Sequence, residues 1–224
     1  MVSDLPPETT VAGPRGFTRP LTQRDHQKLA TREALRTAAL RLFAERGFRE
    51  TTADEIAAAA GVSRRTFFLH FSSKDEVLLG HIAEQLTVLR AELEYAPTDL
   101  PAVARAGHAV AGLAAAMQER DDLLLQLDLL QQAPALLAIN LAQFTAFEGA
   151  IADAVRCWLT GPQPRRLSAD EDAFAELVGT VSIAALRAGM NLWRRRGGRE
   201  SLHRLVDSHV QRLRGGLSTP QPGR

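Results

Sequence analysis

Cysteine and long apolar runs are both scarce in this chain. The single cysteine, Cys157, excludes a disulfide within the chain, and its apolar helical surroundings beside Trp158 predict a buried thiol. No stretch of about 18 uninterrupted apolar residues occurs, and the first residues have no apolar core of the signal-peptide kind. We therefore expect a soluble, cytoplasmic protein that does not contact a membrane.

The sequence also lacks the common signatures of catalysis. Its six histidines include no pair spaced i, i+4, so no helical zinc site is predicted. It has no Gly-x-Ser-x-Gly elbow, no phosphate-binding glycine loop and no dinucleotide fingerprint. We expect no catalytic residues, no metal and no cofactor, which leaves an enzyme as the disfavoured class. Strand-type alternation is absent too, which favours an all-α fold.

Positive charge is abundant but unevenly distributed, and it is nearly all arginine. The near-neutral total of +1 hides a basic segment, because residues 15–74 hold 12 Lys/Arg against 6 Asp/Glu and residues 75–224 hold 15 against 18. Only two lysines occur, Lys28 and Lys74. A basic segment joined to a larger, mildly acidic one indicates a nucleic-acid-binding head on a separate body.

Residues 51–74 within that segment have the pattern of a helix-turn-helix. Thr52 and Glu55 fit a capping box, so a short helix is predicted to start at about Ala53. Gly61 suits the end of that helix, because glycine tolerates positive φ, and Ser63 is a good N-cap for the next one. Two short helices joined in this way are the common device for setting one helix in a DNA major groove.

The second helix of this pair divides into an apolar face and a basic one. A step of about 100° per residue puts Phe67 and Phe71 together as predicted core, with Leu69 opposite them. Phe68 falls on the border, where it is either a core residue at the helix margin or a contact to DNA. Arg64 and Arg65 occupy the first turn, where the helix dipole disfavours cations. A phosphate or guanine partner would offset that cost, although a merely solvated basic turn is the alternative.

A similar anomaly recurs at Lys74, which opens a further helix capped by Ser73 and Glu76. We interpret Lys74 as a phosphate clamp. Upstream, an amphipathic helix ends at Gly47, where Phe48 is expected to fold back onto Phe43. Downstream, apolar residues spaced by three and four predict one helix from Leu78 to Pro97, followed by helices at about 101–119, 121–132, 134–160, 169–197 and 200–214.

The run from Thr31 to Lys74 resembles the TetR/AcrR family of bacterial transcription regulators, whose order of helix, glycine, capped helix, glycine, recognition helix and Ser-Lys it matches. The resemblance implies an all-α fold of about nine helices that binds a palindromic double-stranded DNA operator. It implies four regions: a mobile N-terminal arm (1–20), a helix-turn-helix domain (21–74), a helical effector-binding and dimerisation domain (75–214) and a frayed tail (215–224). The implied DNA-binding residues are Thr52, Ser63, Arg64, Arg65, Thr66, Phe68, His70 and Lys74. The family often has tyrosine at the position of Phe68, so a contact there is expected to be apolar.

The resemblance further implies a homodimer that a small hydrophobic effector releases from DNA. Repression of transcription is expected because most members of the family are repressors. Activation is the alternative, and a nonspecific architectural DNA protein is a more distant one. Residues 185–207 also resemble the acyl-CoA-binding, mycofactocin-regulator-like subgroup, which makes an acyl-CoA-like effector a candidate. The predicted pocket residues are Gln126, Leu127, Leu130, Phe144, Phe147, Arg187 and Met190. A stripe on the last two long helices predicts the dimer interface at Phe174, Leu177, Val178, Val181, Ala185 and Leu205.

Overall fold

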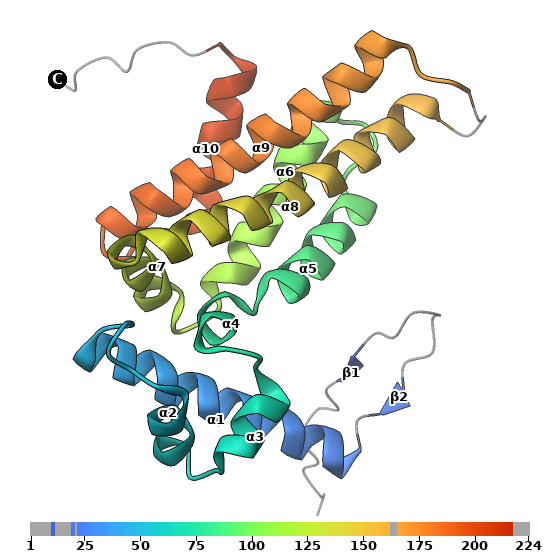
Figure 1. The fold of residues 1–224 in the computed structure, drawn as a ribbon. Helices are drawn as coiled ribbons and strands as arrows, with labels where there is room; N and C mark the ends of the chain where they lie inside the picture. Colours follow the sequence, from blue (N-terminus) through green and yellow to red (C-terminus); the bar gives the residue numbers. More distant parts are fainter. Residues whose placement is uncertain (1–9, 12–18, 21, 162–164, 217–224) are drawn as a thin grey trace, which may run out of the picture. The chain divides into compact units, whose positions relative to one another are not determined.

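The computed structural model describes residues 10–11, 19–20, 22–161 and 165–216. The chain divides into two compact units, a head that ends at Leu78 and a body that begins at Leu79. The described residues form ten helices and one pair of two-residue strands (Figure 1). The predicted all-helical class is confirmed. The predicted domain boundary after Lys74 lies at the start of a helix, whereas the division between the units lies near that helix's end.

The helices of the head begin and end where local signals place them. They are α1 (Gln23–Arg46), α2 (Ala53–Ala59), α3 (Arg64–His70) and α4 (Lys74–Leu79), the last of which ends in the body. Thr52 and Glu55 form a complete capping box at α2, and the Ser63 side chain caps α3. Gly47 and Gly61 have φ of 89° and 70°, a conformation that glycine adopts without strain. These features confirm the predicted end of α1 at Gly47, the predicted start of α2 at Ala53 and the predicted N-cap of α3 at Ser63.

Only small parts of the predicted N-terminal arm are described. The strands β1 (Thr10–Val11) and β2 (Arg19–Pro20) pair in antiparallel orientation. The predicted mobility of residues 1–20 otherwise falls outside the described residues, as does the predicted fraying of the tail beyond residue 216.

One predicted helix is two in the structure. The stripe from Leu78 to Pro97 is interrupted by a turn at Gly80 and His81, so that α4 ends at Leu79 and a new helix begins at Ile82. Glycine is a poor helix former, and the apolar spacing continues across the turn, which hides the break from a periodicity argument. The body contains α5 (Ile82–Tyr95), α6 (Ala102–Gln118), α7 (Leu123–Gln132), α8 (Pro134–Thr160), α9 (Ala169–Arg195) and α10 (Leu202–Arg214).

The core of the body lies among α5, α6, α8, α9 and α10, and α8 and α9 run side by side (Figure 1). Small residues allow these helices to approach closely. A Cβ added at Gly179 of α9 would lie 2.5 Å from the backbone oxygen of Glu148 on α8. A Cβ at Gly189 would meet the Val206 side chain of α10. The helix α10 thus buries its apolar face against α6 and α9 of its own chain.

Two expectations from composition, a buried Cys157 and the absence of a membrane-spanning helix, concern α8 and α9. Cys157 is exposed, so the predicted buried thiol is wrong. A step of about 100° per residue turns Cys157 roughly 200° away from the fully buried Val155, onto the opposite face of α8. Among the described helices, α9 has the length and hydropathy of a membrane span, but half of that stretch is buried inside the body, as in the core helix of a folded domain.

Candidate nucleic-acid interface and effector cavity

The aromatic residues of α3 separate into core and surface as the helical wheel predicts. Phe67 and Phe71 are buried, with ring centroids 5.9 Å apart. Phe68 is 46% exposed and Leu69 is 76% exposed. Phe68 is therefore a surface residue whose ring stands nearly perpendicular to that of Phe67. The exposed Leu69 adds apolar surface in the middle of α3. It is absent from the predicted site residues, although its position on the helix face opposite Phe67 already indicated that it is exposed.

The two arginines in the first turn of α3 differ in their surroundings. Nη1 of Arg64 donates to a carboxylate oxygen of Asp54 at 2.7 Å, and the Arg64 guanidinium lies 5.5 Å from the centre of the Phe68 ring. Arg65 is exposed and has no ion-pair or hydrogen-bond partner among the described residues. Arg65 can therefore meet an incoming phosphate or base without first giving up a contact within the protein.

The hydroxyl groups beside the arginines are held by the caps. The Ser63 and Thr66 oxygens lie 2.9 Å apart, and the Ser63 oxygen also accepts from the Thr66 backbone N–H. The Thr52 hydroxyl donates to the Glu55 carboxylate at 2.9 Å. The pKa of Glu55 lies below its ordinary value because the Thr52 backbone N–H and hydroxyl donate to it and Arg46 is close. A Thr52 hydroxyl that donates to a phosphate would give up its bond to the Glu55 carboxylate, while its oxygen can still accept from the Glu55 backbone N–H.

His70 lies at the C-terminal end of α3 and is half-buried. Its Nδ1 is buried and has no hydrogen-bond partner among the described residues. The pKa of His70 lies below its ordinary value because the ring is partly desolvated and because Lys28 and Arg32 are close. In the chain without DNA, these surroundings favour the neutral form of His70.

The structure gives Lys74 a different task from the predicted phosphate clamp. Its ammonium donates to the backbone oxygens of Phe48, Arg49 and Thr51 at 2.7, 3.1 and 2.9 Å. An ammonium has three N–H groups, so these contacts use all of them. The cation at the start of α4 is thus compensated by the loop between α1 and α2. Because that loop leads directly into Thr52, Lys74 positions the start of α2.

A cavity of about 180 Å³ lies in the body between α7, α8 and α9. Its lining residues are Leu127, Leu130, Gln131, Leu137, Asn140, Leu141, Phe144, Arg187, Met190 and Asn191. Five of the seven predicted pocket residues belong to this set. Gln126 instead lines an adjoining cavity of about 20 Å³ that shares Leu130, Phe144 and Met190. Phe147 lines neither cavity and is a fully buried core residue, which corrects that part of the prediction.

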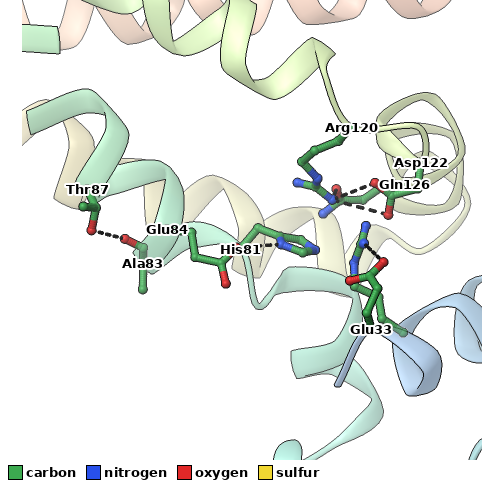
Figure 2. Close-up of polar contacts among 9 residues, drawn as sticks. Glu33, His81, Ala83, Glu84, Thr87, Arg120, Asp122 and Gln126 are labelled. Atoms are coloured by element: carbon green, nitrogen blue, oxygen red, sulfur yellow. Dashed lines mark hydrogen bonds and ion pairs between the residues drawn. The ribbon is translucent and has the colours of Figure 1, made fainter. Parts of the chain in front are cut away.

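Polar residues form a fixed group beside the smaller cavity. Figure 2 shows the Arg120 guanidinium turned toward Asp122 and Gln126, with Nη2 of Arg120 3.1 Å from the Asp122 carboxylate and 2.9 Å from Oε1 of Gln126. His81, which also lines this cavity, lies 3.3 Å from Glu84. The smaller cavity therefore combines an apolar wall of leucine, phenylalanine and methionine with polar groups, Gln126 and His81, that have partners within the body.

The predicted dimer stripe on α9 includes both surface and core residues. Val178 and Ala185 are buried within their own chain, so these two predictions are corrected. Leu205 on α10 is half-buried and packs against the core of the body. Phe174 and Leu177 are exposed, Leu177 to 58%. The neighbouring α8 exposes small residues along one face, namely Ala138, Ala142, Ala146 and Gly149.

The head therefore has the geometry of a helix-turn-helix domain: two capped short helices, a glycine turn and an exposed helix that begins with two arginines. Residues 35–80 match the family model described as bacterial regulatory proteins, tetR family. The head therefore carries a DNA-binding domain of the tetR-family type.

Three similar proteins extend the comparison. TcmR of Streptomyces glaucescens, an HTH-type transcriptional regulator, is 37% identical over 134 residues, which cover 54% of this chain and 57% of TcmR. MftR of Mycobacterium tuberculosis is 39% identical over 56 residues, which cover 25% of this chain and 28% of MftR. The solved structure of Thermus thermophilus FadR, a TetR-family transcriptional repressor in complex with lauroyl-CoA, is 27% identical with a TM-score of 0.52, covering 86% of this chain and all of that one. The chain thus spans little more than half the length of TcmR and less of MftR.

Proposed function

We propose that the chain is a cytoplasmic, sequence-specific DNA-binding transcriptional regulator, and that it represses genes until a small apolar effector binds the body. The observation that carries the proposal is the exposed α3, whose first turn presents Arg64 and the unpartnered Arg65 beside the Ser63 and Thr66 hydroxyls. Arginine in the first turn of an exposed recognition helix suits guanine or phosphate acceptors in a major groove.

The proposed division of labour among the site residues follows from their contacts. Arg65 and Thr66 read bases, and Phe68 makes an apolar contact to a thymine methyl or a sugar. Arg64 takes a DNA acceptor with the N–H groups that Asp54 does not use. Thr52, Ser63 and His70 meet the phosphate backbone through hydrogen bonds, while Lys74 acts indirectly by fixing the start of α2.

The proposed effector enters the cavity of the body. Leucine, phenylalanine and methionine side chains favour an apolar ligand, and Asn140, Arg187 and Asn191 offer polar partners for one end of it. FadR of Thermus thermophilus is described in complex with lauroyl-CoA. An acyl-CoA is therefore a rational first candidate for this chain. The Arg194, Arg195 and Arg196 cluster is less suited to a CoA phosphate, because Arg194 is paired with Asp128 and Arg196 with Glu200.

The proposed dimer forms through the exposed faces of α8 and α9. Phe174 and Leu177 supply apolar side chains, and the small residues of α8 allow a second copy to approach closely. Two heads held in this way would reach successive major grooves of a palindromic operator. An exposed leucine at such a face can be tested directly: Leu177→Glu should shift the protein toward monomer in light scattering, whereas Ser208→Glu on exposed α10 surface should leave the dimer intact.

The central experiment recovers bound genome fragments with the purified full-length chain and measures binding to the recovered duplex and to a scrambled duplex of equal length. Arg65→Ala should reduce the preference for the recovered sequence, by roughly 1–3 kcal/mol if the contact is a bidentate one to guanine. Acyl-CoAs and apolar drugs are then screened for release of the recovered DNA. A typical coupling between effector and DNA is about 1–3 kcal/mol.

Two alternatives give different results in the same assays. An activator would bind the same operator but raise transcription of the adjacent gene in a reconstituted assay. An architectural DNA protein would bind both duplexes alike at physiological salt, and it would have no use for an apolar cavity in its body. An enzyme is not supported by any residue constellation in the sequence, and the related regulators are not described as enzymes.

A further inference from the structure

Asp54 lies on the proposed DNA surface without a capping task of its own. It stands in the first turn of α2, where Glu55, its neighbour, makes the capping hydrogen bonds. The Asp54 carboxylate instead accepts a hydrogen bond from Nη1 of Arg64, the first residue of α3, at 2.7 Å. The side chains of Arg64 and Asp54 are 67% and 57% exposed. A negative charge thus stands beside the first positive charge of the proposed recognition helix.

This ion pair changes what Arg64 presents to an arriving duplex. Arg64 is drawn toward Asp54 with its guanidinium near the Phe68 ring, whereas the adjacent Arg65 has no partner among the described residues. An exposed ion pair is weak, so a phosphate can draw Arg64 away from Asp54. The exchange leaves the Asp54 carboxylate close to phosphates, where like charges repel.

The cost of this repulsion arises where the duplex offers Arg64 only phosphate. A phosphate attracts Arg64 on any duplex, yet it also meets the charge of Asp54. A base edge in the major groove can accept two hydrogen bonds from a guanidinium at a distance from the phosphates. Because Asp54 uses only Nη1 of Arg64, such an acceptor in the correct position can be contacted without loss of the Asp54 pair. An acid placed beside a DNA-reading arginine therefore disfavours the wrong sequences.

We propose that Asp54 is a specificity-determining residue of DNA recognition: it holds Arg64 in the DNA-free protein and suppresses binding to sequences that offer Arg64 only phosphate. This inference rests on the proposed function, because it assumes that α3 reads DNA. It adds a residue that makes no favourable DNA contact itself and acts by competing with DNA for Arg64.

The test compares the wild-type chain with Asp54→Asn on the recovered operator and on its scrambled duplex over a series of salt concentrations. The variant should bind the scrambled duplex roughly three- to tenfold more tightly, and the operator less than about twofold more tightly. The slope of log affinity against log salt for the scrambled duplex should steepen by about 0.9, as expected for one additional phosphate contact. Equal thermal midpoints of the two proteins would show that the fold is unchanged.

Two further variants separate local competition from net charge. Glu45→Gln removes the same charge from an exposed pair with Arg41 on α1, and it should affect both duplexes alike and weakly. In an Arg64→Ala background, Asp54→Asn should no longer change the ratio of operator to scrambled affinity. The inference is overturned if Asp54→Asn leaves that ratio unchanged, or if the change persists without Arg64. A wild-type chain that binds both duplexes alike would overturn the proposed function as well, which distinguishes the two failures.

Discussion

The head and the body are both helical, but different kinds of interaction set their structures. In the head, α2 and α3 begin at side-chain caps, and α1 and α2 are followed by glycines with positive φ. Each of these signals acts within about four residues. In the body, helices distant in sequence meet at glycines that receive a backbone or side chain from the other helix, as Gly179 receives Glu148. The head is therefore defined largely by local rules, and the body by packing that no short window of sequence contains.

Phe67→Ala tests whether the head unfolds independently of the body. Among the variants discussed, it should have the largest effect on the free energy of unfolding. Phe67 is fully buried between α3 and its neighbours, so its removal should cost about 3–5 kcal/mol. Both tryptophans, Trp158 and Trp193, belong to the body, so tryptophan fluorescence reports the body alone while circular dichroism reports all helices. We expect an early loss of helix by circular dichroism with an unchanged fluorescence transition.

Leu69→Ala is the matched control for Phe67→Ala, because Leu69 belongs to the same helix and is largely exposed. Its effect on stability should stay within about 0.5 kcal/mol. If Phe67→Ala moves the fluorescence transition by the same amount as the circular dichroism transition, then the head and the body unfold together and the comparison between them fails.

Gly179→Ala should have the next largest effect, in the body. The added Cβ would lie 2.5 Å from the Glu148 backbone oxygen, so α8 and α9 must move apart, at a cost of about 1–3 kcal/mol. Tryptophan fluorescence should record the earlier unfolding. Ser208→Ala on α10 is the control: Ser208 is exposed, so the change in helix propensity should alter stability by no more than about 0.5 kcal/mol. Equal destabilisation by both variants would contradict the close crossing at Gly179.

These differences explain which features the sequence could predict. The capping residues Thr52 and Ser63, the buried Phe67 and the fold class follow from patterns that local physics sets. The turn at Gly80 was not predicted, because apolar spacing continues across it.

The site residues required knowledge of distant contacts. The sequence shows that Lys74 is a cation at a helix start, but not that the backbone oxygens of Phe48, Arg49 and Thr51 surround it. In the dimer stripe, Val178 lies next to Leu177 in sequence, yet one is core and the other surface. A stripe wide enough to include both cannot separate a helix's own core from a partner-binding face. The five predicted pocket residues that line the larger cavity lie on α7, α8 and α9. The sequence does not show that these three helices come together.

Lys74→Met sharpens the comparison, because it removes long-range contacts that tether one part of the head to another. The variant keeps most of the side-chain length but leaves three backbone oxygens without their donor, so we expect a loss of about 1–2 kcal/mol. The loss should appear in the circular dichroism transition of the head. Lys28→Met, at the only other lysine, is the control and should have little effect, since Lys28 is exposed. A Lys74→Met head as stable as wild type would return Lys74 to the role of a free phosphate ligand.

The smallest predicted effect concerns a local signal inside the body. Ser168 and Glu171 form a capping box at α9, and Arg165 donates to both Glu171 oxygens, at 2.9 and 2.7 Å. The hydrogen bonds from Arg165, and then that from the Ser168 backbone, lower the pKa of Glu171 to about 2. A carboxyl whose pKa is lower in the folded chain stabilises the fold above its unfolded pKa of about 4.5, and that stabilisation is lost as pH falls toward 2.

Glu171→Gln should therefore lower the thermal midpoint of the tryptophan transition slightly at pH 7, and the difference from wild type should shrink between pH 4.5 and 2. Asp99→Asn, at an exposed carboxyl in the loop before α6, controls at pH 7 for the loss of one charge from the body. The Thr52 and Glu55 box of the head has the same capping geometry, so Glu55→Gln should shift the head transition in the same direction, seen by circular dichroism. If Glu171→Gln has no effect at any pH while Glu55→Gln does, local capping matters only in the head, because long-range packing alone then holds the start of α9.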